Sequence, residues 1–263
     1  MGGALLRTTY GGTVMEPIFD KETMFDFTRP SKYELVNYLI NDGKKHPFAL
    51  ICPGGAYAIV ANSIEGRPIA EAINKLGYNA FVLYYRVKDE ALYPNPQDDV
   101  KRAVGEIFSH ADEWGVDTEG WSLWGFSAGG HLAASYCLDS YDAPKPATVV
   151  LGYAVLTLGE KTHPESRDFL LGKDADPSMI EKLSVEKNIT PSYPSAYVWC
   201  GDADDLVDPD NTRMMGKALD EAGVPNITTV FQGIPHGANL CTGTHAEHWL
   251  KDAVEFWQEH RNR

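Results

Sequence analysis

The segment Trp121-Ser122-Leu123-Trp124-Gly125-Phe126-Ser127-Ala128-Gly129-Gly130-His131-Leu132-Ala133-Ala134 decides the fold of this chain. It passes from a short apolar stretch, through a Gly-x-Ser-x-Gly turn, into a run of small residues that favours a helix. Between a strand and a helix, this pattern is typical of a tight turn that holds a serine hydroxyl above the sheet. Gly125 and Gly129 would leave the space that such a turn needs, and the helix dipole would favour a developing anion beside Ser127. We therefore predict that Ser127 is a nucleophile.

Alternating strand and helix patterns surround this segment. Short apolar runs without clean alternation are typical of strands buried on both faces. We expect strands at residues 33–40, 48–52, 80–85, 121–124, 147–155, 196–200 and 227–231, the first of them antiparallel. Helical patterns lie at residues 64–76, 96–114, 210–222 and 246–260. This order predicts an α/β fold in one domain, residues 1–263, with a mostly parallel twisted sheet and helices on both faces.

The stretch from about 156 to 194 departs from this rhythm. It is polar, contains four prolines and shows only a weak helical pattern at 178–183. That is long for a plain connection in a compact domain, so we predict a small lid or pocket wall over one end of the sheet. An ordinary surface meander is the alternative.

The composition excludes several classes of protein. The 263 residues are 43% hydrophobic and 23% charged, which is the balance of a soluble globular chain. Lys and Arg number 23 against 37 Asp and Glu, so the net charge is −14. Because so acidic a chain repels phosphate groups, we expect neither nucleic acid nor an anionic membrane surface as a partner.

Targeting and redox signals are weak. No apolar run approaches the ~20 residues that a bilayer requires, and residues 1–8 lack the pattern of a secretion signal. The four cysteines form no Cys-x-x-Cys pair, so we expect reduced, buried thiols rather than a metal or redox site. They are Cys52, Cys137, Cys200 and Cys241. These features favour a cytoplasmic location.

A serine hydroxyl needs a base, and the base needs an acid that orients it. His236 follows the apolar run 227–231, in a short loop between Pro235 and Gly237, and we predict that it is the base. His131 lies in the helix after the serine, where a supporting role fits better. His245 and His248 are three residues apart, but no carboxylate motif accompanies them, so we predict no metal.

Several aspartates compete for the role of the acid. Asp202, Asp204, Asp205 and Asp208 all follow the run 196–200, and most of them should be solvated or form turns. The spacing Gly-x-x-Asp-x-x-Val favours Asp204, with Asp205 as the alternative.

An acyl-transfer site also needs hydrogen-bond donors for the oxyanion. Cys52-Pro53-Gly54-Gly55-Ala56-Tyr57 follows the run 48–52, where esterases carry an oxyanion loop. The N–H groups of Gly55 and Ala56 would converge with that of Ala128. The alternative is a plain glycine turn.

Together these motifs resemble the α/β-hydrolase superfamily, and within it the acetyl xylan esterase-like and small carbohydrate esterase (carboxylesterase) group. The resemblance covers nearly the whole chain. It rests on Pro53-Gly54-Gly55-Ala56-Tyr57, Tyr84-Tyr85-Arg86-Val87, Tyr93-Pro94-Asn95-Pro96-Gln97-Asp98-Asp99 and Gly125-Phe126-Ser127-Ala128-Gly129-Gly130-His131-Leu132-Ala133, and on residues 201–205 and 235–237.

The resemblance implies a serine esterase that uses Ser127, His236 and Asp204 and no cofactor. In the group an Asp is usually followed by Val-Pro, whereas Asp208 stands between Val207 and Pro209 here, which keeps Asp205 open. The implied substrate is a small acyl ester, with acetyl esters of sugars favoured. Residues suspected of lining the substrate pocket are Tyr57, Tyr84, Arg86 and His131.

Two other functions stay open at this point. Peptidases of the prolyl-oligopeptidase type share such a triad, although the chain has no room for their additional propeller domain. A non-catalytic binding module on a hydrolase scaffold is the other. Whether the chain forms a homo-oligomer cannot be read from the sequence.

Overall fold

One twisted sheet forms the centre of the protein. The computed structural model describes residues 29 and 31–262, so the expectation that residues 1–8 carry no secretion signal lies outside it. Within the described residues the sheet has seven strands in the order β1-β3-β2-β4-β5-β6-β7. They are β1 (Glu34–Tyr38), β2 (His46–Cys52), β3 (Asn79–Tyr84), β4 (Val116–Phe126), β5 (Thr148–Gly152), β6 (Ser195–Gly201) and β7 (Asn226–Phe231). Strand β1 pairs antiparallel with β3 and the other pairings are parallel, which confirms the predicted fold class.

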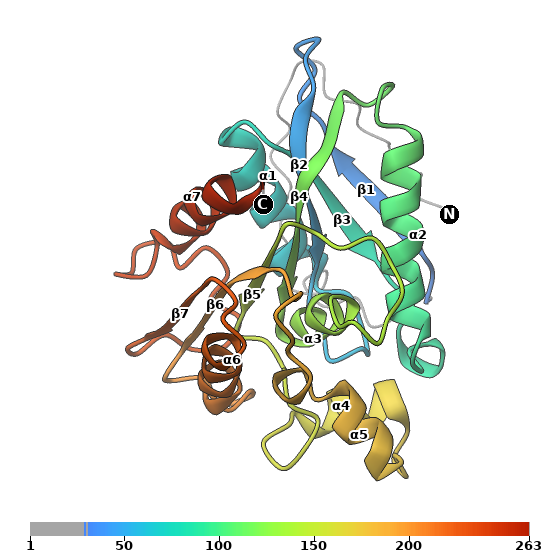
Figure 1. The fold of residues 1–263 in the computed structure, drawn as a ribbon, viewed down its shortest axis with the longest axis vertical. Coiled ribbons are helices and arrows are strands. Elements are labelled where there is room, and N and C mark those ends of the chain that lie inside the picture. Colours follow the sequence, from blue (N-terminus) through green and yellow to red (C-terminus); the bar gives the residue numbers. More distant parts are fainter. Residues whose placement is uncertain (1–28, 30, 263) are drawn as a thin grey trace, which may run out of the picture.

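Helices cover both faces of this sheet (Figure 1). The main helices are α1 (Arg67–Lys75), α2 (Asn95–Ser109), α3 (Ser127–Tyr136), α4 (Pro164–Leu171), α5 (Pro177–Leu183), α6 (Asp210–Glu221) and α7 (Trp249–His260). Buried residues of α1 and α7 belong to one hydrophobic cluster, and those of α2, α3 and α6 belong to another. Because apolar side chains on both faces of the central strands are removed from water, the continuous apolar runs of the sequence become strands of a two-sided core.

Several predicted boundaries are wrong by a few residues. The strand predicted over 147–155 ends at Gly152, because Tyr153 takes a positive φ of 37° that no strand accommodates. The helix predicted over 64–76 divides into a π-turn, η2 (Asn62–Gly66), and α1. The helix predicted over 246–260 begins only at Trp249.

The segment 156–194 contains more structure than its sequence suggests. It holds α4, α5 and a 3-10 turn, η4 (Val185–Lys187). The expected helix near 178–183 is present as α5, whereas α4 was not expected. Leu170, Leu183 and Val185 are fully buried in the same cluster as α3, so the segment packs onto the domain rather than standing apart. Figure 1 shows α4 and α5 beyond the end of the sheet, below α3.

The burial of the cysteines agrees with the expectation from the sequence. All four cysteines are buried and free. No helix in the described part of the chain has the length and hydrophobicity to cross a membrane.

Candidate active site

The turn between β4 and α3 places Ser127 in a strained conformation. Its φ is +52°, in the left-handed region that residues with a side chain rarely adopt. A Cβ on Gly125 would lie 2.3 Å from the carbonyl oxygen of Gly129, and a Cβ on Gly129 would lie 2.1 Å from that of Cys52. Both glycines are therefore required by close backbone approach, as expected for a turn that exposes the serine.

Three side chains from different parts of the chain meet at this turn. The Nε2 atom of His236 lies 3.0 Å from Oγ of Ser127, and Nδ1 lies 2.7 Å from Oδ2 of Asp204. Because an ionised carboxylate can only accept, Nδ1–H donates to Asp204 and Nε2 is left to accept from the serine hydroxyl. Asp204 follows β6 and His236 follows β7, so the parallel order of the sheet brings both loops to the same edge as Ser127.

The loop after β6 separates its aspartates by function. The side chain of Asp204 is 0% exposed, and its Oδ1 accepts the backbone N–H groups of Leu206 and Val207 at 3.0 and 2.8 Å. Asp205 is exposed. Asp208 accepts the backbone N–H of Asp210 in the expected turn-forming role, whereas Asp202 accepts that of Gly233 and so joins this loop to the one after β7. The structure therefore brings Asp204, and not Asp205, to His236.

The Gly54–Ala56 turn lies against the serine. A Cβ on Gly54 would be 2.6 Å from Cβ of Ser127, so the two residues are in direct contact. Gly55 and Ala56 have φ values of +120° and +57°. Among the described residues, the N–H groups of Gly55, Ala56 and Ala128 have no hydrogen-bond partner, so they are free to donate to a bound group.

Two of the suspected pocket residues belong to the core instead. Tyr57 and His131 are both 0% exposed. The Tyr57 hydroxyl lies 3.0 Å from Nδ1 of His131, and Nε2 of His131 lies 2.9 Å from the carbonyl oxygen of Leu183. Burial lowers the pKa of His131 to about 4, so the imidazole is neutral and ties α3 to α5. The expectation that they line a pocket was wrong, because α3 is buried along its length after Ser127 and the Tyr57 ring packs beneath the surface against Tyr85 and His131.

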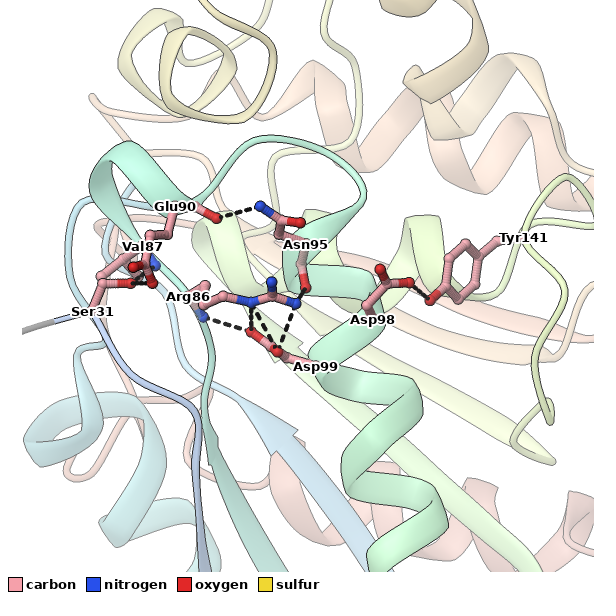
Figure 2. Close-up of polar contacts among 8 residues, drawn as sticks. All are labelled: Ser31, Arg86, Val87, Glu90, Asn95, Asp98, Asp99 and Tyr141. Atoms are coloured by element: carbon pink, nitrogen blue, oxygen red, sulfur yellow. Dashed lines mark hydrogen bonds and ion pairs between the residues drawn. The ribbon is translucent and has the colours of Figure 1, made fainter.

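The other two suspected pocket residues also make framework contacts. Figure 2 shows the guanidinium of Arg86 directed at the carboxylate of Asp99, with Nη2 and Oδ1 2.9 Å apart. Arg86 Nη2 also donates to the carbonyl oxygen of Asn95 at 2.7 Å. The ring of Tyr84 lies under the guanidinium of Arg29, 3.6 Å from the ring centroid. The motif that contains Arg86 therefore joins the end of β3 to α2, and a role of Tyr84 and Arg86 in the substrate pocket stays a prediction.

Two residues that the sequence did not single out border the serine and the histidine. The ring of Tyr153 packs 4.9 Å from the imidazole of His236, measured between ring centroids. Glu65 is 5% exposed, and its Oε2 accepts the N–H of Gly54 at 2.6 Å. The position of Tyr153 directly after a buried strand was a usable signal, whereas Glu65 resembled any polar residue of a helix.

An open depression lies beside Asp204. The segment after β5 contributes residues 160–162 to its lining, and the loop after β6 contributes residues 204–206, Asp208 and Pro209. Ser127 and His236 are not among the lining residues, so the predicted lid or pocket wall at about 156–194 stays a prediction. Within the described residues no group of three or more His, Cys, Asp or Glu is arranged to hold a metal ion. His248 instead lies near Asp252, with Nε2 and Oδ2 3.5 Å apart.

The chain is similar in sequence and fold to known esterases. The sequence matches the BD-FAE family over residues 38–219. It is 30% identical over 243 residues to an endo-1,4-beta-xylanase B of Butyrivibrio fibrisolvens, covering 87% of this chain and 38% of that protein. It is 30% identical over 142 residues to an acetylxylan esterase of Xylanibacter ruminicola, covering 52% of this chain and 29% of that protein. The chain thus spans only part of these curated relatives.

A solved structure agrees over nearly the whole chain. An acetyl ester-xyloside bifunctional hydrolase from Caldicellulosiruptor lactoaceticus has a TM-score of 0.80 and 29% identity, covering 92% of this chain and 91% of that one. The relatives and this neighbour confirm the expected resemblance to the esterases of the α/β-hydrolase superfamily.

Proposed function

Because this chain belongs to the BD-FAE family, we propose that it hydrolyses short-chain carboxylic esters with Ser127 as nucleophile, His236 as base and Asp204 as the orienting acid. The observation that carries this proposal is the hydrogen-bonded line from Ser127 Oγ through His236 to Asp204, with contacts of 3.0 and 2.7 Å. What the whole protein acts on is a proposal as well, since the chain covers only 38% of the xylanase and 29% of the acetylxylan esterase.

The chemistry follows from the geometry of these three groups. Ser127 Oγ attacks the ester carbonyl carbon while its proton passes to Nε2 of His236. Asp204 accepts from Nδ1–H throughout and stabilises the imidazolium that forms. The alcohol leaves with the proton from Nε2, which yields an acyl-serine. Water then attacks the acyl group with the same histidine as base, and Ser127 is released. No cofactor takes part in these steps.

The tetrahedral intermediate places a negative charge on the former carbonyl oxygen. We assign its stabilisation to the N–H groups of Gly55, Ala56 and Ala128, which are unpaired among the described residues. Ala128 lies in the first turn of α3, where the helix dipole adds a favourable field. Such preorganised donors are often the largest contribution to catalysis in acyl transfer.

Acetyl esters of sugars are the substrate class that we favour. Names of the similar proteins refer to acetylxylan and to an acetyl ester-xyloside substrate. The net charge of −14 disfavours anionic polymers. A cytoplasmic location and a single domain over 1–263 stay predictions, and the oligomeric state stays open.

An activity panel tests both parts of this proposal. A p-nitrophenyl ester series should give its highest kcat/KM at about two to four acyl carbons, and acetylated xylose should be turned over. A maximum at about eight carbons or more would exclude the short-chain assignment. Faster turnover of a proline amide than of any ester would favour a peptidase, and no labelling by a fluorophosphonate probe would favour a non-catalytic binding module.

A further inference from the structure

A buried carboxyl group lies directly behind the proposed oxyanion turn. Glu65 lies in η2, the π-turn that precedes α1, and is 5% exposed. Its Oε2 accepts the N–H of Gly54 at 2.6 Å. The carbonyl oxygen of Gly54 is bound as well, because it accepts the N–H of Ala61 at 2.9 Å. Both polar groups of Gly54 are therefore fixed by residues 61–65.

Gly54 transmits this constraint to the nucleophile. A Cβ on Gly54 would lie 2.7 Å from Oε2 of Glu65 on one side and 2.6 Å from Cβ of Ser127 on the other. It would also lie 2.8 Å from the carbonyl oxygen of Phe126. The glycine thus fills the whole space between the carboxyl group and the serine. A displacement of Glu65 would move the turn that carries the free amides of Gly55 and Ala56.

The surroundings of Glu65 supply no ordinary counter-ion. No Lys or Arg pairs with its carboxyl group among the described residues. Burial raises the pKa of Glu65, while the Gly54 N–H, the imidazolium charge of His236 and the Tyr153 hydroxyl act in the opposite direction. A carboxyl group that is desolvated without a cation costs folding free energy. Its presence beside the candidate site is more easily understood if it organises that site.

We propose that Glu65 is a positioning residue for ester hydrolysis: by accepting the Gly54 N–H behind Ser127, it holds the Gly54–Ala56 turn so that two amides face the oxyanion. This inference rests on the function proposed above. Glu65 touches neither substrate nor reacting atoms in this role, so its effect should appear in the stabilisation of the transition state and not in substrate binding.

The test compares Glu65→Ala, Glu65→Gln and Glu65→Asp. Glu106→Gln is the control, because the carboxylate of Glu106 in α2 is half-buried and accepts from the Tyr33 hydroxyl, with no contact to the Gly54 turn. For p-nitrophenyl acetate, Glu65→Ala should lower kcat by about 10- to 10³-fold, the scale of a lost oxyanion donor, with KM within ~3-fold. The inhibition constant of phenylboronic acid, which forms a tetrahedral serine adduct, should rise by a similar factor.

The conservative variants separate positioning from a merely structural role. Glu65→Gln keeps an amide oxygen that can accept the Gly54 N–H, so it should recover most of the lost kcat, to within ~10-fold of the parent. Glu65→Asp draws the carboxylate back by one methylene and should lower kcat without a change in KM. If Glu65→Ala does not fold, this pair still decides the question.

Three outcomes would overturn the inference. They are a parent-like kcat in folded Glu65→Ala or Glu65→Asp, a parent-like affinity for phenylboronic acid, and a loss shared equally by Glu106→Gln. A failure of the proposed function looks different. In that case the parent protein itself would neither hydrolyse esters nor react with a fluorophosphonate.

Discussion

Asp204 and Asp205 are neighbours in the chain, yet only the side chain of Asp204 is buried against His236, at 2.7 Å, while that of Asp205 lies in solvent. Asparagine at position 204 can present its amide so that the wrong imidazole tautomer is favoured. We therefore expect Asp204→Asn to lower kcat by about 10⁴-fold and Asp205→Asn to change it less than ~3-fold. Steady-state kinetics on a short-chain ester measures both, and a crippling Asp205→Asn would transfer the role to that residue.

Removal of either reacting side chain should abolish most activity and leave the fold intact. Ser127→Ala and His236→Ala should each lower kcat by ~10³- to 10⁶-fold, because nucleophile and base act as one unit. Both variants should lose most labelling by a fluorophosphonate, because the probe reacts with the serine hydroxyl that the histidine activates. Denaturation midpoints close to that of the parent would establish that the loss is chemical. More than about a tenth of the parent kcat in Ser127→Ala would contradict its assignment as nucleophile.

The glycine beside the serine should not tolerate a methyl group. In Gly54→Ala the new Cβ would meet Ser127 Cβ at 2.6 Å and the Phe126 carbonyl oxygen at 2.8 Å, neither of which can move freely. We expect a loss of ~1–3 kcal/mol in the free energy of unfolding, together with a large loss of kcat. Gly105→Ala in α2 is the control. A Cβ there meets nothing within 4 Å, so Gly105→Ala should raise the free energy of unfolding by about 0.5–1 kcal/mol. Urea titration of both variants should show a decrease in the free energy of unfolding for Gly54→Ala and an increase for Gly105→Ala.

The buried His131 should make the protein sensitive to mild acid. Its pKa falls from 6.5 to about 4 because of burial, so between these values the unfolded chain binds a proton that the folded chain does not. The contribution of a neutral His131 to stability is therefore complete above pH 6.5 and decreases as the pH falls toward 4. At pH 5 the expected loss is ~2 kcal/mol. Urea unfolding measures the free energy of unfolding at pH 5 and at pH 7.5. The difference between the two values should be smaller for His131→Gln than for the parent, and an equal difference would refute this assignment.

The ion pair of Arg86 and Asp99 should matter for stability and not for catalysis. The Asp99 side chain is 4% exposed and accepts from both the backbone N–H and the guanidinium of Arg86. Asp99→Ala leaves the half-buried guanidinium of Arg86 and its backbone N–H without their partner, so we expect the free energy of unfolding to fall by about 3 kcal/mol. Asp98→Ala is the control, since the exposed carboxylate of Asp98 accepts from the Tyr141 hydroxyl and not from Arg86 among the described residues, as Figure 2 shows. Among folded molecules kcat and KM should match the parent, and a selective rise in KM would return Arg86 to the substrate pocket.

Local patterns in the sequence were sufficient for much of the fold and for the main candidates of the site. The apolar runs predicted the buried strands, because removal from water on both faces requires apolar side chains throughout. The motif around Ser127 could be interpreted because a strand, a tight turn and a helix are contiguous. His236 could be found by its place after a strand, since parallel strands end at one edge of the sheet.

Other features depended on contacts between distant segments. Asp204 and Asp205 have the same chemistry and nearly the same position, so only the packing of the loop after β6 against His236 distinguishes them. Tyr57 and His131 appeared close to the motifs of the site, yet the bond between them lies in the core. Glu65 has the sequence pattern of a helix residue. Only its hydrogen bond with Gly54 shows that it supports the Gly54–Ala56 turn beside Ser127.

The sequence by itself determined the strand and helix order, the serine turn and the candidate base, because each follows from neighbouring residues and their hydrophobic pattern. Only the tertiary structure decided which carboxylate meets the imidazole, which aromatic residues are buried, and what supports the Gly54 turn. The physical reason is that burial and hydrogen bonding of a polar side chain are set by the atoms that surround it in space, and these come from parts of the chain that no local pattern connects.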